Sequence, residues 1–361
     1  MFFLEKDRLI EVFERLKGDY TVIAPKIEKG AILYQRVSAF EDLPFGYRDH
    51  QKPGYYRIEK IDTEKFFTYT HPVNSLKNFL HPPELTLMRI KKGDKRVRFS
   101  YDIPRERYAF FDVRACDLKA LRILDGVFIE KNNFPDPYYR SLRENIFVVA
   151  VNCTYATDVC FCATLSSGPE VKEGFDICLT EIRDGFVVEV GSKKGMELLK
   201  DMHLKEANKE QIKEKERRVA NLKVREEKLP EDLRDRLYEA MEHPFWDQVA
   251  KRCLACTNCT QVCPTCFCFD VLEINDMDLK KSVRMRVWDS CFNPSFATVH
   301  KFNIRESIMS RYRQWLMHKF AYWVDQFDTL GCVGCGRCIT WCPVGIDVLE
   351  SVKELLKGVG S

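Results

Sequence analysis

The sequence predicts three parts in order: an α/β domain over residues 1–204, a charged helical connector over residues 205–242 and an all-α domain over residues 243–361. Up to about residue 200, short apolar runs alternate with segments of helical periodicity, as in α/β proteins. The connector is dominated by Lys, Glu and Arg, which is typical of a solvated helix. Beyond it, apolar residues recur with helical spacing between two runs of cysteine.

The strands and helices of the first domain follow from local apolar patterns. Residues 1–17 place apolar side chains on one helix face, and residues 85–102 predict a hairpin that turns near Gly93. "YTVIAP" and "AILYQRV" are further strand candidates. The continuous apolar runs "YAFFDV" and "NIFVVAV" predict strands buried on both faces. Because the helical repeat "DLKALRILDGVF" lies between them, we expect a βαβ unit.

The composition is that of a globular protein, with 45% hydrophobic and 31% charged residues among 361. No apolar run approaches the roughly 20 residues that cross a bilayer, so we expect no membrane insertion. The first residues carry charges from Glu5 onward and no small-residue cleavage site, which argues against a signal peptide. We therefore expect a cytoplasmic protein. In that compartment, sixteen cysteines favour metal or redox chemistry over disulfides.

The two cysteine runs in the third part each spell C-x2-C-x2-C-x3-C-P, and this is the spacing of bacterial ferredoxins. Zinc sites use two CxxC pairs or Cys/His mixtures instead. In the ferredoxin pattern, three cysteines of a run bind one cluster and the fourth binds the other. We therefore expect an α-helical ferredoxin-like domain with two [4Fe–4S] clusters, one held by Cys253, Cys256, Cys259 and Cys342 and the other by Cys332, Cys335, Cys338 and Cys263.

Four further cysteines follow predicted strands of the first domain. Cys116 opens the helix after "YAFFDV", Cys153 follows "NIFVVAV", and Cys160 and Cys162 lie in the next loop. The carboxyl ends of parallel strands meet at one sheet edge, where α/β proteins place ligands. These four cysteines predict a third [4Fe–4S] site. The alternative is a set of buried thiols without a ligand, since free cysteine packs as a small hydrophobe.

The remaining cysteines carry weaker signals. We expect Cys266, Cys268 and Cys291 to line the nearby clusters; the alternative is a further cluster with a non-cysteine ligand such as His300. Cys178, in the strand-like "FDICLTEI", is expected in the core.

Residues 280–319 form a basic segment with interleaved aromatic residues. This composition suggests either nucleic-acid binding or a face that balances anionic clusters and docks an acidic partner. No nucleic-acid module accompanies the segment, so we expect no nucleic acid. We expect Arg284, Arg286 and Arg311 on the docking face.

The order of motifs "VRACDLKALRILD", "CFC", "CLACTNCTQVCPTCFC", "WDSC" and "CVGCGRCITWCP" resembles the iron–sulfur β subunit of cytosolic NAD(P)-linked [NiFe] hydrogenases, the sulfhydrogenases. The A subunit of anaerobic sulfite reductase has a similar order. "HPFWD" before the first run also fits. The resemblance implies a non-catalytic electron-transfer subunit of an anaerobic oxidoreductase complex. Its partners are then a flavin/NAD(P)-binding reductase subunit and the small and large [NiFe] hydrogenase subunits or, in the alternative, a sirohaem subunit.

The motifs that the sequence lacks also indicate that catalysis takes place on other subunits. The sequence has no G-x-G-x-x-G after a strand and no P-loop, so flavin and NAD(P) are expected on a partner. It has no CxxC pairs at its two ends, as a [NiFe] centre needs. We expect no catalytic residue. A different class, a scaffold with structural clusters, remains as an alternative, but two adjacent ferredoxin runs favour a relay.

Overall fold

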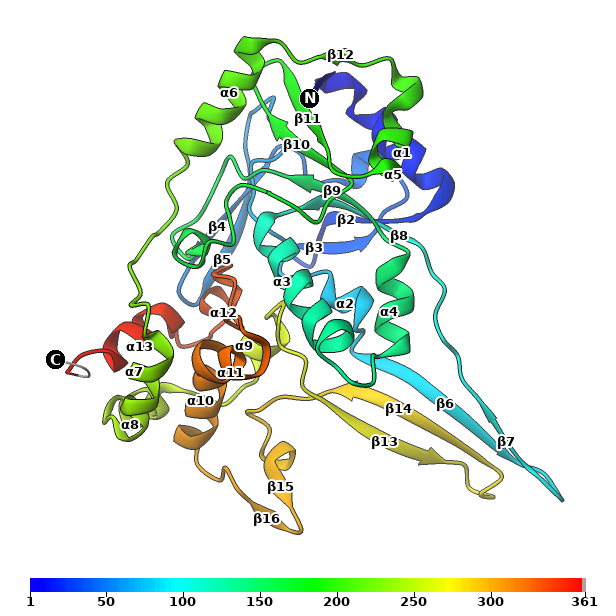
Figure 1. Ribbon diagram of the computed structural model, residues 1–361, viewed down its shortest axis with the longest axis vertical. Coiled ribbons are helices and arrows are strands. Elements are labelled where there is room, and N and C mark those ends of the chain that lie inside the picture. The colour runs from blue at the N-terminus through cyan, green and yellow to red at the C-terminus, as the bar shows by residue number, and fades with distance from the viewer. Residues whose placement is uncertain (359–361) are drawn as a thin grey trace.

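The largest element of the molecule is an eight-stranded sheet with the order β12-β1-β11-β10-β9-β8-β2-β3, at the top of Figure 1. The computed structural model describes residues 1–358. The central neighbours β2, β8, β9 and β10 are parallel, and the outer pairs are antiparallel. The strands are β1 (Phe2–Glu5), β2 (Thr21–Glu28), β3 (Ala31–Arg36), β8 (Tyr108–Val113), β9 (Phe147–Val151), β10 (Ile177–Glu181), β11 (Gly185–Val190) and β12 (Lys205–Glu206).

The predicted βαβ unit is present as β8, helix α3 (Ala115–Asp125) and β9. Both strands are buried along their whole length and pair in parallel. Because successive side chains of a strand point to opposite faces, Phe110 and Phe111 enter two different cores. The carboxyl ends of both strands open at one edge of the sheet, so the residues after them, including Cys116 and Cys153, lie near that edge.

Helices cover both faces of the sheet. Leu121 and Leu124 of α3 pack in the core on one face, together with residues of α2 and α4. Phe13 and Leu16 of α1 pack in the core on the other face, together with α5. The bounds are α1 (Leu9–Asp19), α2 (Lys77–Leu80), α4 (Pro137–Glu144) and α5 (Lys193–Leu199).

A second sheet projects from the body as an arm, at the lower right of Figure 1. Its order is β13-β14-β6-β7, all antiparallel. The pair of β6 (Glu84–Lys92) and β7 (Val97–Ser100) is the hairpin expected over residues 85–102. Its other half, β13 (Phe269–Asn275) and β14 (Lys281–Trp288), comes from between the cysteine runs.

The prediction of an all-α ferredoxin-like domain for residues 243–361 is therefore wrong, and the fold is mixed α/β. Besides β13 and β14, this part holds a small ribbon of β15 (Thr298–Val299) and β16 (Phe302–Asn303). Residues 308–327 are helical, as their spacing indicates, but residues 269–275 and 281–288 of the same interval are strands. Yet β14 is completed by β6, which lies far away in the sequence, and no local pattern shows such a partner.

The C-terminal helices surround a core of their own that contains Trp246, Tyr312, Trp315 and Leu349. The helices are α7 (Leu233–Glu239), α8 (Phe245–Arg252), α9 (Asn258–Gln261), α10 (Ile308–Met317), α11 (Trp323–Phe327), α12 (Arg337–Thr340) and α13 (Val348–Leu355). A π-helical turn, His318–Tyr322, joins α10 to α11. None of the helices in the described range is long and apolar enough to cross a membrane.

Two further segments connect these parts. The charged connector contains α6 (Lys209–Ala220), then an irregular stretch over residues 222–230, and α7. The hairpin of β4 (Tyr47–Lys52) and β5 (Tyr55–Lys60) reaches from the first domain to the second cysteine run, where Gly54 N donates to Ile339 O at 3.1 Å.

Candidate iron–sulfur centres

The two cysteine runs share one backbone conformation. In the first run, Ala255 and Thr257 have left-handed φ angles of 50° and 69°. At the matching positions of the second run, Gly334 and Gly336 have φ angles of 61° and 80°. A short helix follows in each case, α9 after the first run's loop and α12 after the second's. Equal spacing has therefore produced equal loops.

Each loop directs a backbone N–H at a cysteine sulfur. Ala255 N lies 3.4 Å from Cys253 Sγ, and Gly334 N lies 3.5 Å from Cys332 Sγ. Such N–H groups stabilise negative charge on sulfur and help to set the reduction potential of a cluster. Both loops are thus shaped to surround an anionic group.

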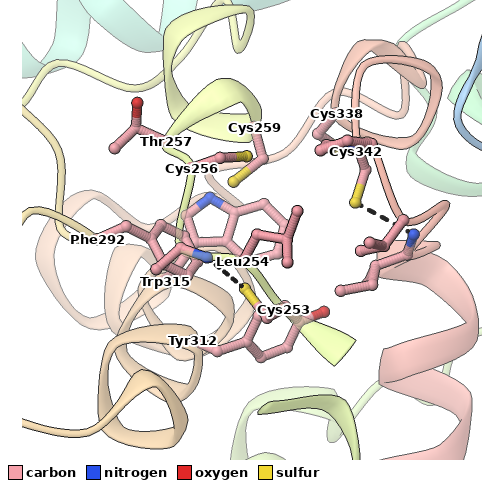
Figure 2. A pocket seen from close by; sticks show the side chains of 14 residues that line it. Cys253, Leu254, Cys256, Thr257, Cys259, Phe292, Tyr312, Trp315, Cys338 and Cys342 are labelled. Atoms are coloured by element: carbon pink, nitrogen blue, oxygen red, sulfur yellow. Dashed lines mark hydrogen bonds between the residues drawn. The ribbon is translucent and has the colours of Figure 1, made fainter. Parts of the chain in front are cut away.

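The cysteines assigned to the first cluster lie around one cavity (Figure 2). Its lining includes Cys253, Cys256 and Cys259 from the first run and Cys342 from the second. Cys338 reaches the same cavity. Ile346 N donates to Cys342 Sγ at 3.3 Å. The buried rings of Phe292, Tyr312 and Trp315 also line the cavity and add an apolar wall.

The cysteines assigned to the second cluster are also close to one another. Burial is the main reason why the pKa of the Cys332 thiol rises to about 12; Cys263 and Cys335 add to the rise, and Lys319 opposes it. Burial likewise raises the pKa of Cys338, and Cys332, Cys335 and Cys263 add to the rise. Thiols that repel one another's negative charge and are shielded from water stay protonated until a metal takes them as thiolates.

The four N-terminal cysteines lie together at the sheet edge, as expected from the βαβ unit. Cys116, Cys153, Cys160 and Cys162 line one cavity, and Cys335 of the second run lines it too. Burial is the main reason why the pKa of Cys160 rises to about 12. The N-terminal group and the second run therefore adjoin each other.

Buried polar contacts hold the second run against the first domain. Arg337 pairs with Asp117 at 2.8 Å, and both side chains are at most 1% exposed. His71 Nε2 lies 2.6 Å from Cys335 O, and burial lowers the pKa of this histidine to about 4. Thr340 Oγ1 donates to Gln51 Oε1 at 2.7 Å. The first run is not enclosed in this way, since Cys256 is exposed.

The donor set fits iron–sulfur clusters better than a single ion. Among residues 1–358, no three His, Cys, Asp or Glu side chains converge closely enough to hold one metal ion. A cubane places its ligands around a multi-atom core instead, so thiols spread around a cavity suit it. The first cavity offers sulfur donors together with apolar walls and N–H groups, as [4Fe–4S] sites do, and the N-terminal cavity offers five cysteine side chains.

Several side chains lie elsewhere than the sequence indicated. Arg286 is 3% exposed and pairs with Asp136, and Arg311 is 8% exposed and donates to Phe292 O at 3.0 Å. Of the three arginines expected on a docking face, only Arg284 is exposed, and it pairs with Glu273. A count of charges along the sequence does not show the partners that these side chains find in the fold.

Other cysteines and histidines are clearly placed. Cys178 is fully buried in β10, as expected of a core residue. His300 is exposed and lies outside the cavity that Cys266, Cys268 and Cys291 line. Sequence reasoning missed Lys319, whose Nζ lies 3.1 Å from Cys263 Sγ. A lysine within the apolar run "WLMHKFAYW" was the available signal.

Two comparisons with known proteins agree with this geometry. Residues 252–346 match the family model described as a 4Fe-4S dicluster domain. The chain is 33% identical over 317 residues to the protein named sulfhydrogenase 2 subunit beta of Pyrococcus furiosus, a match that covers 84% of this chain and 90% of that protein. No solved structure matches.

Proposed function

The chain belongs to the family of hydrogenase β subunits and is an iron–sulfur electron-transfer subunit, and on that premise we propose that it relays electrons between a flavin/NAD(P)-binding subunit and a [NiFe] hydrogenase module. The observation that carries the proposal is the crosswise arrangement of the runs. Cys342 of the second run lines the cavity of Cys253, Cys256 and Cys259, and this supports an exchange of fourth ligands like that of two-cluster ferredoxins.

Three groups of thiols hold three [4Fe–4S] clusters in this proposal. The first group is Cys253, Cys256, Cys259 and Cys342; the second is Cys332, Cys335, Cys338 and Cys263; the third is Cys116, Cys153, Cys160 and Cys162. Each cluster, when bound, takes up and releases one electron. The third group is supported by one shared cavity, and Cys335 connects it to the second group.

The protein's own residues shield and orient these groups. The rings of Phe292, Tyr312 and Trp315 place an apolar wall beside the first group. Gly334 and Gly336 allow the second run to approach the N-terminal loop, since a Cβ at these positions would lie 2.5 Å from Phe161 O and 2.3 Å from Val159 O. The order third, second, first then leads from the interior to the exposed Cys256.

The iron content of the full chain, purified without oxygen, tests the proposal. Two clusters give about eight irons and three give about twelve. Cys116→Ser is expected to remove about four irons, because the third group loses a ligand. Cys178→Ser, which changes a buried thiol of β10, is the control and is expected to keep them all. A chain with no iron would overturn the relay. An unchanged iron content in Cys116→Ser would refute the third cluster.

The partner subunits need a separate experiment, because they decide the terminal chemistry. We expect the chain to co-purify with a flavoprotein and a nickel-containing large subunit. The isolated chain is expected to show no turnover with hydrogen or NAD(P)H. Co-purification of a sirohaem protein would instead place the same relay in a sulfite reductase.

A further inference from the structure

Three cysteines outside the three proposed groups meet in one cavity. Cys266 and Cys268 follow the first run directly, and Cys291 follows β14. All three line a cavity that they share with Lys319 and His318. Asp289 N donates to Cys268 O at 2.9 Å and so holds the segment before Cys291 against Cys268. The segments that precede β13 and follow β14 thus bring three thiols together.

A buried ammonium group points into this thiol group. Lys319 is 5% exposed, and its Nζ lies 3.1 Å from Cys263 Sγ and 3.3 Å from Cys266 Sγ. Its other contacts are Thr265 Oγ1 and Gly331 O, each at 3.5 Å, and no carboxylate in the described range pairs with it. Burying an ammonium is costly unless a negative charge compensates it. Cys263, as a ligand of the second cluster, can supply that charge for Lys319.

A second buried ammonium group, that of Lys77, lies at the backbone of Cys266. Lys77 is 3% exposed, and its Nζ donates to Cys266 O at 3.0 Å and lies 3.8 Å from the centre of the Trp288 ring. Two buried cations therefore lie at Cys266, Lys77 at its carbonyl oxygen and Lys319 at its sulfur. The ferredoxin pattern gives this thiol no role.

We propose that Cys266, Cys268 and Cys291 hold an additional iron–sulfur cluster through three thiolates, with Lys77 and Lys319 as counter-charges. Metal-bound thiols are deprotonated, which gives the two ammonium groups the negative charge they need. His318 Nε2 accepts a hydrogen bond from Trp323 Nε1 at 2.8 Å, so that nitrogen is already engaged. Three thiolates suit a three-iron cluster or a four-iron cluster with one iron not held by cysteine.

This inference rests on the proposed relay and extends it. Lys319 Nζ contacts both Cys263 Sγ and Cys266 Sγ, at 3.1 and 3.3 Å, so the additional cluster adjoins the second group. An electron on the second cluster then has two neighbours, one toward the N-terminal group and one toward the base of the arm. The path of electrons would therefore branch at the second cluster.

The test uses native mass spectrometry, iron and sulfide analysis of the full chain purified without oxygen. We expect one cluster more than the three groups provide. Cys268→Ser and Cys291→Ser are each expected to lose about three or four irons. Cys178→Ser is the matched control, because it also alters a buried thiol, and it is expected to lose none.

The outcomes separate this inference from the relay. An unaltered chain that carries two clusters, or three of which Cys116→Ser removes one, overturns the additional cluster and leaves the relay standing. Full iron in both serine variants does the same. A chain without iron refutes both. Because the count is made on the unaltered protein, it stands even if a variant does not fold. Electron paramagnetic resonance of the oxidised and reduced protein then assigns the three-iron or four-iron form, and either supports the proposal.

Discussion

The two cysteine runs have the same spacing and the same loop conformation, but their surroundings differ. In the first run, Leu254 is 60% exposed and Cys256 is exposed. The matching residues of the second run, Val333 and Cys335, are 2% and 8% exposed. The β4–β5 hairpin and the N-terminal cysteine loop cover the second run. Spacing thus determines how each loop surrounds its group, and packing determines which group lies at the surface.

The comparison predicts that the second run depends on buried charge and the first does not. Arg337→Met leaves Asp117 buried without its partner, and this costs about 3–5 kcal/mol of folding free energy. The matching residue of the first run is the exposed Asn258, so Asn258→Ala is expected to change stability by about 0.5 kcal/mol or less. Denaturant midpoints of the two variants measure the difference. Equal losses would show that the two runs are held alike.

The loop positions give the next largest effect. Gly334→Ala adds a Cβ 2.5 Å from Phe161 O on a left-handed backbone, and overpacking of this kind costs about 1–3 kcal/mol. We expect this variant to lose iron from the second and third groups. The reverse change in the first run, Ala255→Gly, relieves a left-handed alanine and is expected to retain all iron. Iron loss from Ala255→Gly alone would contradict the comparison.

The smallest effect concerns docking at the exposed run. Leu254→Asp is expected to keep all iron but weaken electron transfer with the partner about tenfold, as loss of a contact worth roughly 1.4 kcal/mol does. Leu279→Asp changes a leucine that is 69% exposed near the tip of the arm and is the matched control. Rates of partner-coupled viologen reduction report both. A loss confined to Leu279→Asp would place the docking surface on the arm.

Sequence reasoning found the features that depend on local pattern. The C-x2-C spacing predicted the matching loops, and the βαβ unit predicted that Cys116 and Cys153 would share a sheet edge with Cys160 and Cys162. It failed where distant segments meet. The partner of β14 is β6, and the partner of Arg286 is Asp136. Nothing near these residues in the sequence shows their partners, so local patterns predict neither the strand β14 nor the buried position of Arg286.

In the proposed relay, the thiol groups hold clusters that pass electrons in series. The electron paramagnetic resonance spectrum of the dithionite-reduced full chain tests this relay most directly. Adjoining groups such as the second and the N-terminal one, which share Cys335 at one cavity, are expected to give magnetically coupled, reducible clusters. Clusters that stay redox-silent under dithionite, with full iron content, would contradict the relay and indicate a structural role.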